Sequence, residues 1–227
     1  MKHAITPLVL STATFGLMLG VAENAQASGL IRNVTATTPG FTGTAQGNIN
    51  ATTNGAGLPL NTPSLTGNHA ATNTTTTNTN AWRSAANSTT NPISSGTIEF
   101  AFNRIYNLAG FSFWNIGGTG SVPNQGINTV TIEYRLGTGG TWTTLSGAPT
   151  SFAIGSSSGS VSAQPFSFTP VLATNVRFRN MANYGGLSGL NNRIGFNEIQ
   201  FRSIPEPSST LALLALGLAG VGLKKRI

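Results

Sequence analysis

The segment IEFAFNRIYNLAGFSFWN, residues 98–115, decides the fold class of this chain. In its first part Ile98, Phe100 and Phe102 alternate with smaller or polar residues, and the FSFW stretch near its end alternates in the same way. A period of two residues is typical of a β-strand that buries one face and exposes the other. The segment therefore predicts a strand at each of its ends.

The same alternation recurs on the C-terminal side of this segment. It is found in TVTIEYR (129–135), PFSF (165–168) and NVRFRN (175–180), and Gly- and Ser-rich turns separate these stretches. No stretch with the 3.6-residue period of a helix lies between the two ends of the chain. Short strands at this spacing predict an all-β protein with an antiparallel β-sandwich or jelly-roll fold.

The last predicted strand, in RIGFNEIQF, has an interrupted alternation. Its apolar pairs are Ile194 with Phe196 and Ile199 with Phe201, which point to opposite faces in a regular strand. A β-bulge beside Glu198 would bring both pairs to the same face and redirect that carboxyl group. The alternative interpretation is that one pair faces the core while Phe196 packs under a loop.

The composition limits the classes of function. Only 7% of the 227 residues are charged, and the formal net charge is +7. The eight arginines between residues 28 and 204 are scattered, whereas a nucleic-acid surface gathers its basic residues, so no nucleic-acid partner is predicted. The chain has no cysteine and must fold without disulfides.

Residues 1–27 contain the three parts of a secretory signal peptide. Lys2 is the basic part, the apolar part runs from Leu8 to Val21, and Ala25 and Ala27 form an A-x-A cleavage site. We therefore expect a signal helix, cleavage after Ala27 and a mature protein outside the cytoplasm. A buried N-terminal helix is the alternative.

The C-terminal end has a second apolar segment. Pro205, Glu206 and Pro207 precede the apolar run 208–223, and three basic residues follow it. A helix of this length spans roughly 24 Å, which is short of the ~30 Å of a hydrocarbon core. We expect a helix of transmembrane type that holds the chain in the inner membrane before processing.

These C-terminal parts, in this order, resemble a PEP-CTERM sorting signal covering residues 204–227. The resemblance implies export, processing by an exosortase-type enzyme, and delivery to the cell surface or the extracellular matrix. A plain C-terminal anchor is the alternative, and it also places the body of the protein outside the cytoplasm.

The body, residues 28–203, resembles a discoidin-like (F5/8 type C) domain of the galactose-binding-like class, with a Thr/Asn-rich loop at 60–92. The resembling stretches are LIRNVTATTPG (30–40), NINATTNGAGL (48–58), AWRS (81–84), the segment 98–115, GINTVTIEYRLGTGGTWTTL (126–145), TNVRFR (174–179) and GFNEIQF (195–201). The resemblance implies a β-sandwich whose loops at one end bind ligands, often sugars.

The resemblance also implies a structural calcium ion, with a departure in this chain. The family commonly has Asp-Gly where this chain has Asn54-Gly55, and the chain contains no aspartate. Calcium takes six to eight hard oxygen ligands. Asn54 offers a neutral oxygen and Glu198 a carboxylate, so these two residues are the candidates for a weak site, and an empty or hydrogen-bonded loop is the alternative.

The candidate ligand-binding residues are His69, Trp82, Arg83 and Asn115. Sugar recognition uses an aromatic platform together with planar polar side chains. His69, Trp82 and Arg83 lie in or beside the Thr/Asn-rich loop, and Asn115 follows Trp114 at a strand end. The alternative is that the tryptophans belong to the core and that Arg83 pairs with a nearby carbonyl group.

An enzyme is not expected. Glycoside hydrolysis needs two carboxylates at a set separation, and the body offers only Glu99, Glu133 and Glu198. The sequence therefore predicts a non-catalytic protein of the cell surface or matrix that acts in adhesion or in binding extracellular polysaccharide. The alternative is a purely structural coat or matrix protein, which carries sugars on its polar loop and binds no specific ligand.

Overall fold

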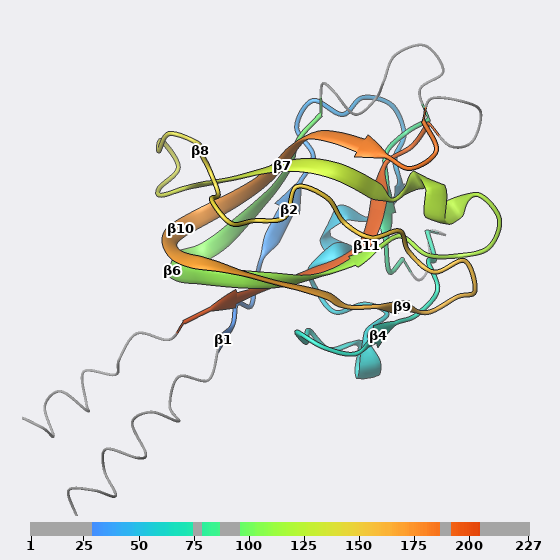
Figure 1. Ribbon diagram of the computed structural model, residues 1–227, viewed down its shortest axis with the longest axis horizontal. Helices are drawn as coiled ribbons and strands as arrows, with labels where there is room; N and C mark the ends of the chain where they lie inside the picture. The colour runs from blue at the N-terminus through green and yellow to red at the C-terminus, as the bar shows by residue number, and fades with distance from the viewer. Residues whose placement is uncertain (1–28, 75–78, 87–95, 187–191, 205–227) are drawn as a thin grey trace, which may run out of the picture. The chain divides into compact units, whose positions relative to one another are not determined.

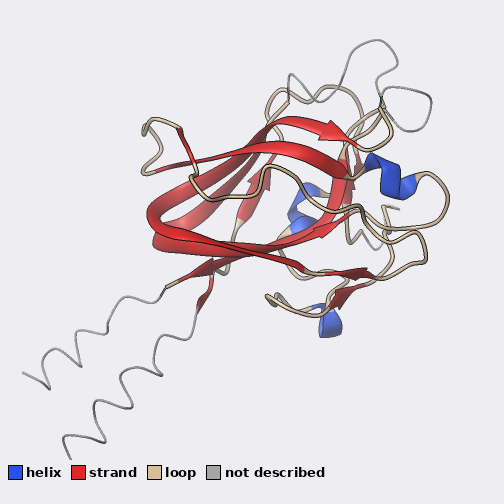
Figure 2. Ribbon diagram, viewed as in Figure 1, coloured by secondary structure: helices blue, strands red, loops and turns tan. Residues whose placement is uncertain are grey.

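The computed structural model describes residues 29–74, 79–86, 96–186 and 192–204, which form strands joined by loops and short 3₁₀ helices (Figures 1 and 2). The predicted all-β, antiparallel class is confirmed. The predicted signal helix and the predicted C-terminal helix lie outside the described residues. The strands are β1 (Gly29–Leu30), β2 (Thr35–Thr37), β3 (Gln46–Gly47), β4 (Asn68–His69), β5 (Trp82–Arg83), β6 (Ile98–Asn115), β7 (Ile127–Arg135), β8 (Thr143–Thr144), β9 (Val161–Ser162), β10 (Gln164–Asn183) and β11 (Gly195–Ser203), and the 3₁₀ helices are η1 (Ile49–Thr52), η2 (Pro59–Asn61) and η3 (Val122–Gln125).

Two long antiparallel strands, β6 and β10, organise both layers of the sandwich. The first half of β6 pairs with β2 and with the second half of β10, which in turn pairs with β7. The second half of β6 pairs with the first half of β10 and with β11. Figure 1 shows β6 and β10 turning together where their labels stand. Each long strand therefore passes from one layer into the other.

The bend explains why the sequence predicted two strands where the structure has one. The sequence predicted two short strands in place of β6 and two in place of β10, and this prediction was wrong. The pairing of β10 with β6 shifts register between Ser167 and Val171 and again between Ala173 and Asn175. Irregularities of this kind bend a strand. At the bend neither face of the strand is fully buried, so the alternation is lost although the backbone pairing continues.

The core between the two layers is built of phenylalanine rings. Phe100, in the first half of β6, contacts Phe201 of β11 with ring centroids 5.2 Å apart. Phe113, in the second half of β6, stacks on Phe152 at 4.0 Å and lies 6.2 Å from Phe178 of β10. Aromatic pairs at 4.5–7 Å add to the free energy gained from burying their area. The contacts join residues of opposite layers, as a β-sandwich requires.

The predicted β-bulge in β11 is confirmed. Phe196 pairs with Asn115 and Glu198 pairs with Trp114, so residue 197 is the extra residue of the bulge. Ile199 and Phe201 join Phe196 in the core as a result. Glu198 then lies on the other face of β11, where the loop 53–57 covers it and the side chain is fully buried.

A cluster of charged side chains lies on the outer face of the first layer, which is formed by β2, β7, the first half of β6 and the second half of β10. Glu133 on β7 accepts from Arg177 on β10 at 2.5 Å and lies 3.0 Å from Arg179. The guanidinium groups of Arg135 and Arg177 lie 4.4 and 4.3 Å from the centre of the Trp142 ring. Glu133 is thus engaged in cross-strand ion pairs with two arginines of β10.

Candidate functional site

Loops far apart in the sequence meet over the first residues of β11. Thr72 donates its hydroxyl hydrogen to Asn197 at 2.7 Å, and the Asn197 amide nitrogen lies 2.9 Å from His69 Nδ1. The backbone N–H of Gly55 donates to Glu198 at 3.0 Å. The bulge in β11 presents residues 197 and 198 to these loops, and their polar side chains hold the loops in place.

A cavity of about 490 Å³, lined by uncharged residues that include three asparagines, lies between two of these loops. Asn80 shapes one wall, because it accepts from the backbone of Asn73 at 2.6 Å and donates to the carbonyl group of Ala71 at 3.0 Å. Asn61 accepts from the backbone N–H of Gly57 at 3.0 Å on the other wall. The seven lining residues carry no formal charge and no aromatic ring: Ala56, Gly57, Asn61, Ala70, Asn73, Thr79 and Asn80.

His69 lies directly behind this cavity. Its ring is fully buried, with Nδ1 2.7 Å from the carbonyl oxygen of Ala70. Gly57 separates it from the cavity, and a Cβ on Gly57 would come within 2.6 Å of His69 Nε2. Burial lowers the pKa of the imidazole, so the ring is neutral near pH 7. His69 therefore supports the cavity from behind and does not line it.

The structure places Trp82 and Arg83 in supporting positions. Trp82 is buried, and its ring packs edge-on against Phe41 and Phe196 at 5.3 and 6.5 Å, which is the core role considered as the alternative. Arg83 donates to Gln125 at 3.0 Å and to the hydroxyl group of Thr74 at 2.8 Å. These contacts tie the Thr/Asn-rich loop to its neighbours.

Asn115 is also buried, and its amide group is fully hydrogen-bonded. It donates to the carbonyl groups of Ile127 and Ala153, both at 2.8 Å. Its oxygen accepts from the backbone N–H groups of Ile116 and Ile127, both at 3.0 Å. The four predicted ligand residues therefore do not meet in one open site.

No sequence pattern identifies the residues that do line the cavity. Asn61, Asn73, Thr79 and Asn80 belong to a segment whose Thr/Asn composition predicts only a polar loop. Asn73 and Asn80 face each other because their backbones are hydrogen-bonded as well, at 3.0 Å. That pairing depends on how the loop folds back on itself, which composition does not determine.

The residues near Glu198 do not form a set of calcium ligands. Glu198 Oε1 faces two donors, the backbone N–H of Gly55 and the side-chain amide of Gln200. The oxygen of Asn54 accepts from the backbone of Ala56 at 2.9 Å. Calcium needs six to eight oxygen ligands, and the donors here occupy the Asn54 oxygen and one of the two Glu198 oxygens. Glu198 Oε2 is buried without a hydrogen-bond partner, and it is a single oxygen.

Burial raises the pKa of the Glu198 carboxyl to about 8, against the opposing effect of its hydrogen bonds from Gly55 and Gln200. The ordinary value is 4.5, so the folded state binds this proton more tightly than the unfolded state does. The stabilising contribution of the protonated carboxyl is fully present below pH 4.5 and is lost as the pH rises through about 8.

We expect the free energy of unfolding to fall between those pH values, by up to about 1.4 kcal/mol per pH unit. Urea denaturation at several pH values, compared between wild type and Glu198→Gln, measures the effect. The comparison is needed because the lowered pKa of His69 gives the opposite slope, with stability lost as the pH falls below 6.5. Parallel curves for the two proteins would contradict the expectation.

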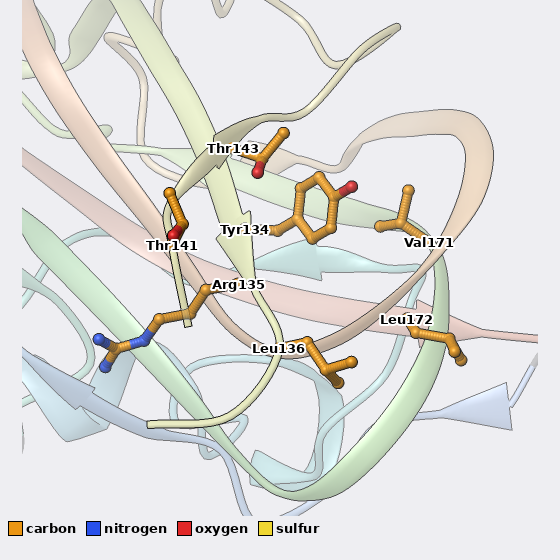
Figure 3. A pocket seen from close by; sticks show the side chains of 7 residues that line it. All are labelled: Tyr134, Arg135, Leu136, Thr141, Thr143, Val171 and Leu172. Carbon is orange, nitrogen blue, oxygen red and sulfur yellow. The ribbon is translucent and has the colours of Figure 1, made fainter. Parts of the chain in front are cut away.

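A second cavity, of about 450 Å³, lies beside β7, β8 and the bend of β10. Figure 3 shows the Tyr134 ring between Thr143 and Val171, while the guanidinium group of Arg135 points away from them. Leu136 and Leu172 are about half exposed at this cavity. None of the predicted site residues lines it, and its walls offer fewer planar polar groups than the first cavity.

Comparison with known proteins identifies the C-terminal segment. Residues 203–226 match the PEP-CTERM protein-sorting motif. The predicted sorting signal at 204–227 is thereby confirmed, and it indicates an exported protein. No curated protein sequence matches the chain. Within the described ranges no helix is long and apolar enough to span a membrane, and the apolar run 208–223 lies outside those ranges.

Similar solved structures belong to the class that the sequence resembles. The family 32 carbohydrate-binding module of Clostridium perfringens NanJ, solved with galactose, has a TM-score of 0.48 and 12% identity over 78% of this chain and 99% of its own. A second C. perfringens module, GH89 CBM32-5, solved with GalNAc-β-1,3-galactose, has a TM-score of 0.47 and 14% identity over 76% and 99%. An F5/8 type C domain from Bacteroides fragilis has a TM-score of 0.41 and 11% identity over 79% and 98%. The β-sandwich described above rests on the strand pairing of this chain itself, since TM-scores below 0.5 do not establish a shared fold.

Proposed function

We propose that this exported chain is a non-catalytic surface or matrix protein whose β-sandwich binds neutral carbohydrate. An exosortase-type enzyme processes its C-terminal signal, and the bound polymer is extracellular polysaccharide, so the protein acts in adhesion. The observation that carries the binding proposal is the uncharged cavity lined by residues from 56–61, 70–73 and 79–80.

The chemistry of the cavity walls suits a ligand rich in hydroxyl groups. An asparagine side chain both donates and accepts hydrogen bonds, and Asn61, Asn73 and Asn80 bring three such groups together. The NH₂ group of Asn61 has no hydrogen-bond partner among the described residues and remains free for a ligand. A cavity of about 490 Å³ lies within the range of small-ligand sites. Because no charged group lines it, a neutral sugar fits better than an acidic one.

The positions of the carboxyl groups favour a protein that binds carbohydrate without cleaving it. Hydrolysis of a glycosidic bond needs a second carboxyl group within about 10 Å of the first. Glu99 and Glu133 are paired with arginines on the outer face of the first layer. Glu198 is buried beneath the loop 53–57 and is the one carboxyl group near the cavity in the described part of the chain.

Filling the cavity tests the binding site. Ala70 lines the cavity with an exposed side chain, whereas its exposed neighbour Ala71 does not line it. We expect Ala70→Trp to weaken retention on a glycan array of neutral oligosaccharides by at least about tenfold, because one blocked subsite is worth about 1.4 kcal/mol or more. Ala71→Trp, the matched control, is expected to bind like the wild type.

Two results would contradict the proposal. Failure of the wild type to retain any sugar, with and without calcium, favours the purely structural matrix protein instead. Equal loss of binding in Ala70→Trp and Ala71→Trp places the site elsewhere. The protein for the array is recovered from the producing cells, and its intact mass is measured. Loss of residues 1–27 would support export. A full-length cytoplasmic species would contradict it.

A further inference from the structure

We propose that the side chains of Gln200 and Glu198 hold the loop 53–57 onto β11 in the place of a metal ion, so that this domain needs no calcium. The sequence resemblance implies calcium at this loop, and the donors found there disagree with that implication. The inference is independent of whether the cavity binds a sugar.

We call this set of hydrogen bonds the clasp: the side-chain amide of Gln200 lies between the carbonyl oxygen of Thr53 and a carboxyl oxygen of Glu198. Gln200 donates through Nε2 to the carbonyl oxygen of Thr53 at 3.1 Å, and the same nitrogen donates to Glu198 Oε1. The backbone N–H of Gly55 donates to that carboxyl oxygen from the opposite side of the loop. All three side chains, those of Gln200, Glu198 and Thr53, are buried. The loop and the strand are thus joined by donors and acceptors that belong to the chain.

An amide NH₂ group and a cation can each hold two oxygen atoms close together. A cation draws oxygens together by its charge, and an NH₂ group does so with its two hydrogens. Here the nitrogen of Gln200 lies between the oxygens of Thr53 and Glu198, where a bound ion would have to lie. Calcium would have to displace this nitrogen and also leave the Gly55 N–H without its acceptor.

The predicted second ligand does not compensate for that loss. Asn54 is exposed, and its oxygen closes a turn by accepting from Ala56. Glu198 would be the one formal negative charge facing the ion, and taking a divalent cation out of water with a single carboxylate costs more than the pair returns. The residues of the loop therefore favour the hydrogen-bonded clasp over an ion.

The clasp also fixes one wall of the cavity. Ala56 and Gly57, which line the cavity, follow directly on the hydrogen bond of Gly55. A Cβ at position 55 would lie 2.3 Å from the backbone nitrogen of Pro63, and φ is +83° there, so the turn requires glycine. Glycine thus allows the turn at position 55, and the side chains of Gln200 and Glu198 anchor the loop in this conformation.

Thermal unfolding of the purified full chain, in millimolar calcium and in chelator, tests the proposal. We expect the melting temperature of the wild type to differ by less than about 1 °C between the two conditions, because a ligand that binds the folded state raises it and an absent site does not. A wild-type melting temperature raised by about 3 °C or more in calcium would overturn the proposal.

Two isosteric variants separate a clasp from a loop that is simply empty. Gln200→Met removes the donors at similar volume, and we expect the melting temperature to fall by about 5 °C equally in both conditions. Gln200→Glu replaces the amide donor with a second carboxylate, and we expect a larger loss in chelator that calcium partly restores. An unchanged melting temperature for Gln200→Met would show that no clasp exists.

Discussion

Replacing Phe113 with alanine is expected to lower the free energy of unfolding by about 4 kcal/mol. The ring is fully buried, and it is stacked between Phe152 at 4.0 Å and Phe196 at 5.5 Å, while Phe178 of the other layer lies at 6.2 Å. Truncation removes the transfer free energy of the ring and leaves a cavity that rigid neighbours fill poorly. Urea denaturation followed by tryptophan fluorescence measures the loss.

Two further variants show whether the loss comes from this central position. Phe113→Leu keeps most of the volume, and we expect it to cost about half as much as the alanine variant. Phe168→Ala removes the same ring from a partly exposed position at the edge of the core, and we expect it to cost about 1 kcal/mol. Equal losses for Phe113→Ala and Phe168→Ala would contradict the sandwich core described here.

The second large effect is expected at Asn115. Asn115→Ala removes four hydrogen bonds, and it takes this partner from the buried N–H groups of Ile116 and Ile127 and from the buried carbonyl group of Ile127, whereas the carbonyl group of Ala153 keeps its hydrogen bond from Gln164. Each unsatisfied buried group costs about 1–3 kcal/mol, so a loss of about 4 kcal/mol is expected even if some groups relax toward water. The same denaturation experiment measures it.

Asn115→Asp is a second test of the same hydrogen bonds, because it changes one atom and keeps the shape. The new oxygen would face the carbonyl oxygens of Ile127 and Ala153, which are acceptors like itself. We expect this variant to be as unstable as the alanine variant at neutral pH and to recover stability at low pH, where the protonated carboxyl group donates one hydrogen bond. Asn115→Ala with unchanged stability but lost sugar retention would return Asn115 to the ligand role that its sequence position suggested.

Phe113 and Asn115 show which buried residues the sequence predicts and which it does not. Phe113 was correctly placed on a buried face, because alternation along a strand is a local property. Asn115 was considered as a ligand residue, because a polar side chain at the end of a strand is exposed in most proteins. The structure buries it where the end of β6, the start of β7 and the segment around Ala153 converge, and a buried amide with complete hydrogen bonding is a structural element.

The clasp shows that contacts between residues far apart in the sequence are also hard to predict from local patterns. Glu198 was recognised as unusual from the broken alternation of GFNEIQF, and the bulge that followed from this pattern is present. The resemblance placed the loop at Asn54-Gly55 near Glu198, but the residue pattern alone does not predict this contact, because Gly55 is 143 residues away. Gln200 occupies an ordinary polar strand position in the sequence, and its part in the contact was not predicted. The groups that hydrogen-bond to Glu198 depend on which loop is folded over β11.

The sequence by itself determined the class of fold and the sorting signal at the C-terminal end, and it offered the bulge in the last strand as one of two interpretations. These properties are local: a period of two residues, a change of parity and an ordered motif are complete within a few neighbouring residues. Only the tertiary structure decided that β6 and β10 each run through both layers, that Trp82 and Asn115 are buried, and that three asparagines line a cavity. Those outcomes depend on contacts between residues far apart in the chain, and the free energy of such contacts is settled by the packing of the whole sandwich rather than by any one segment.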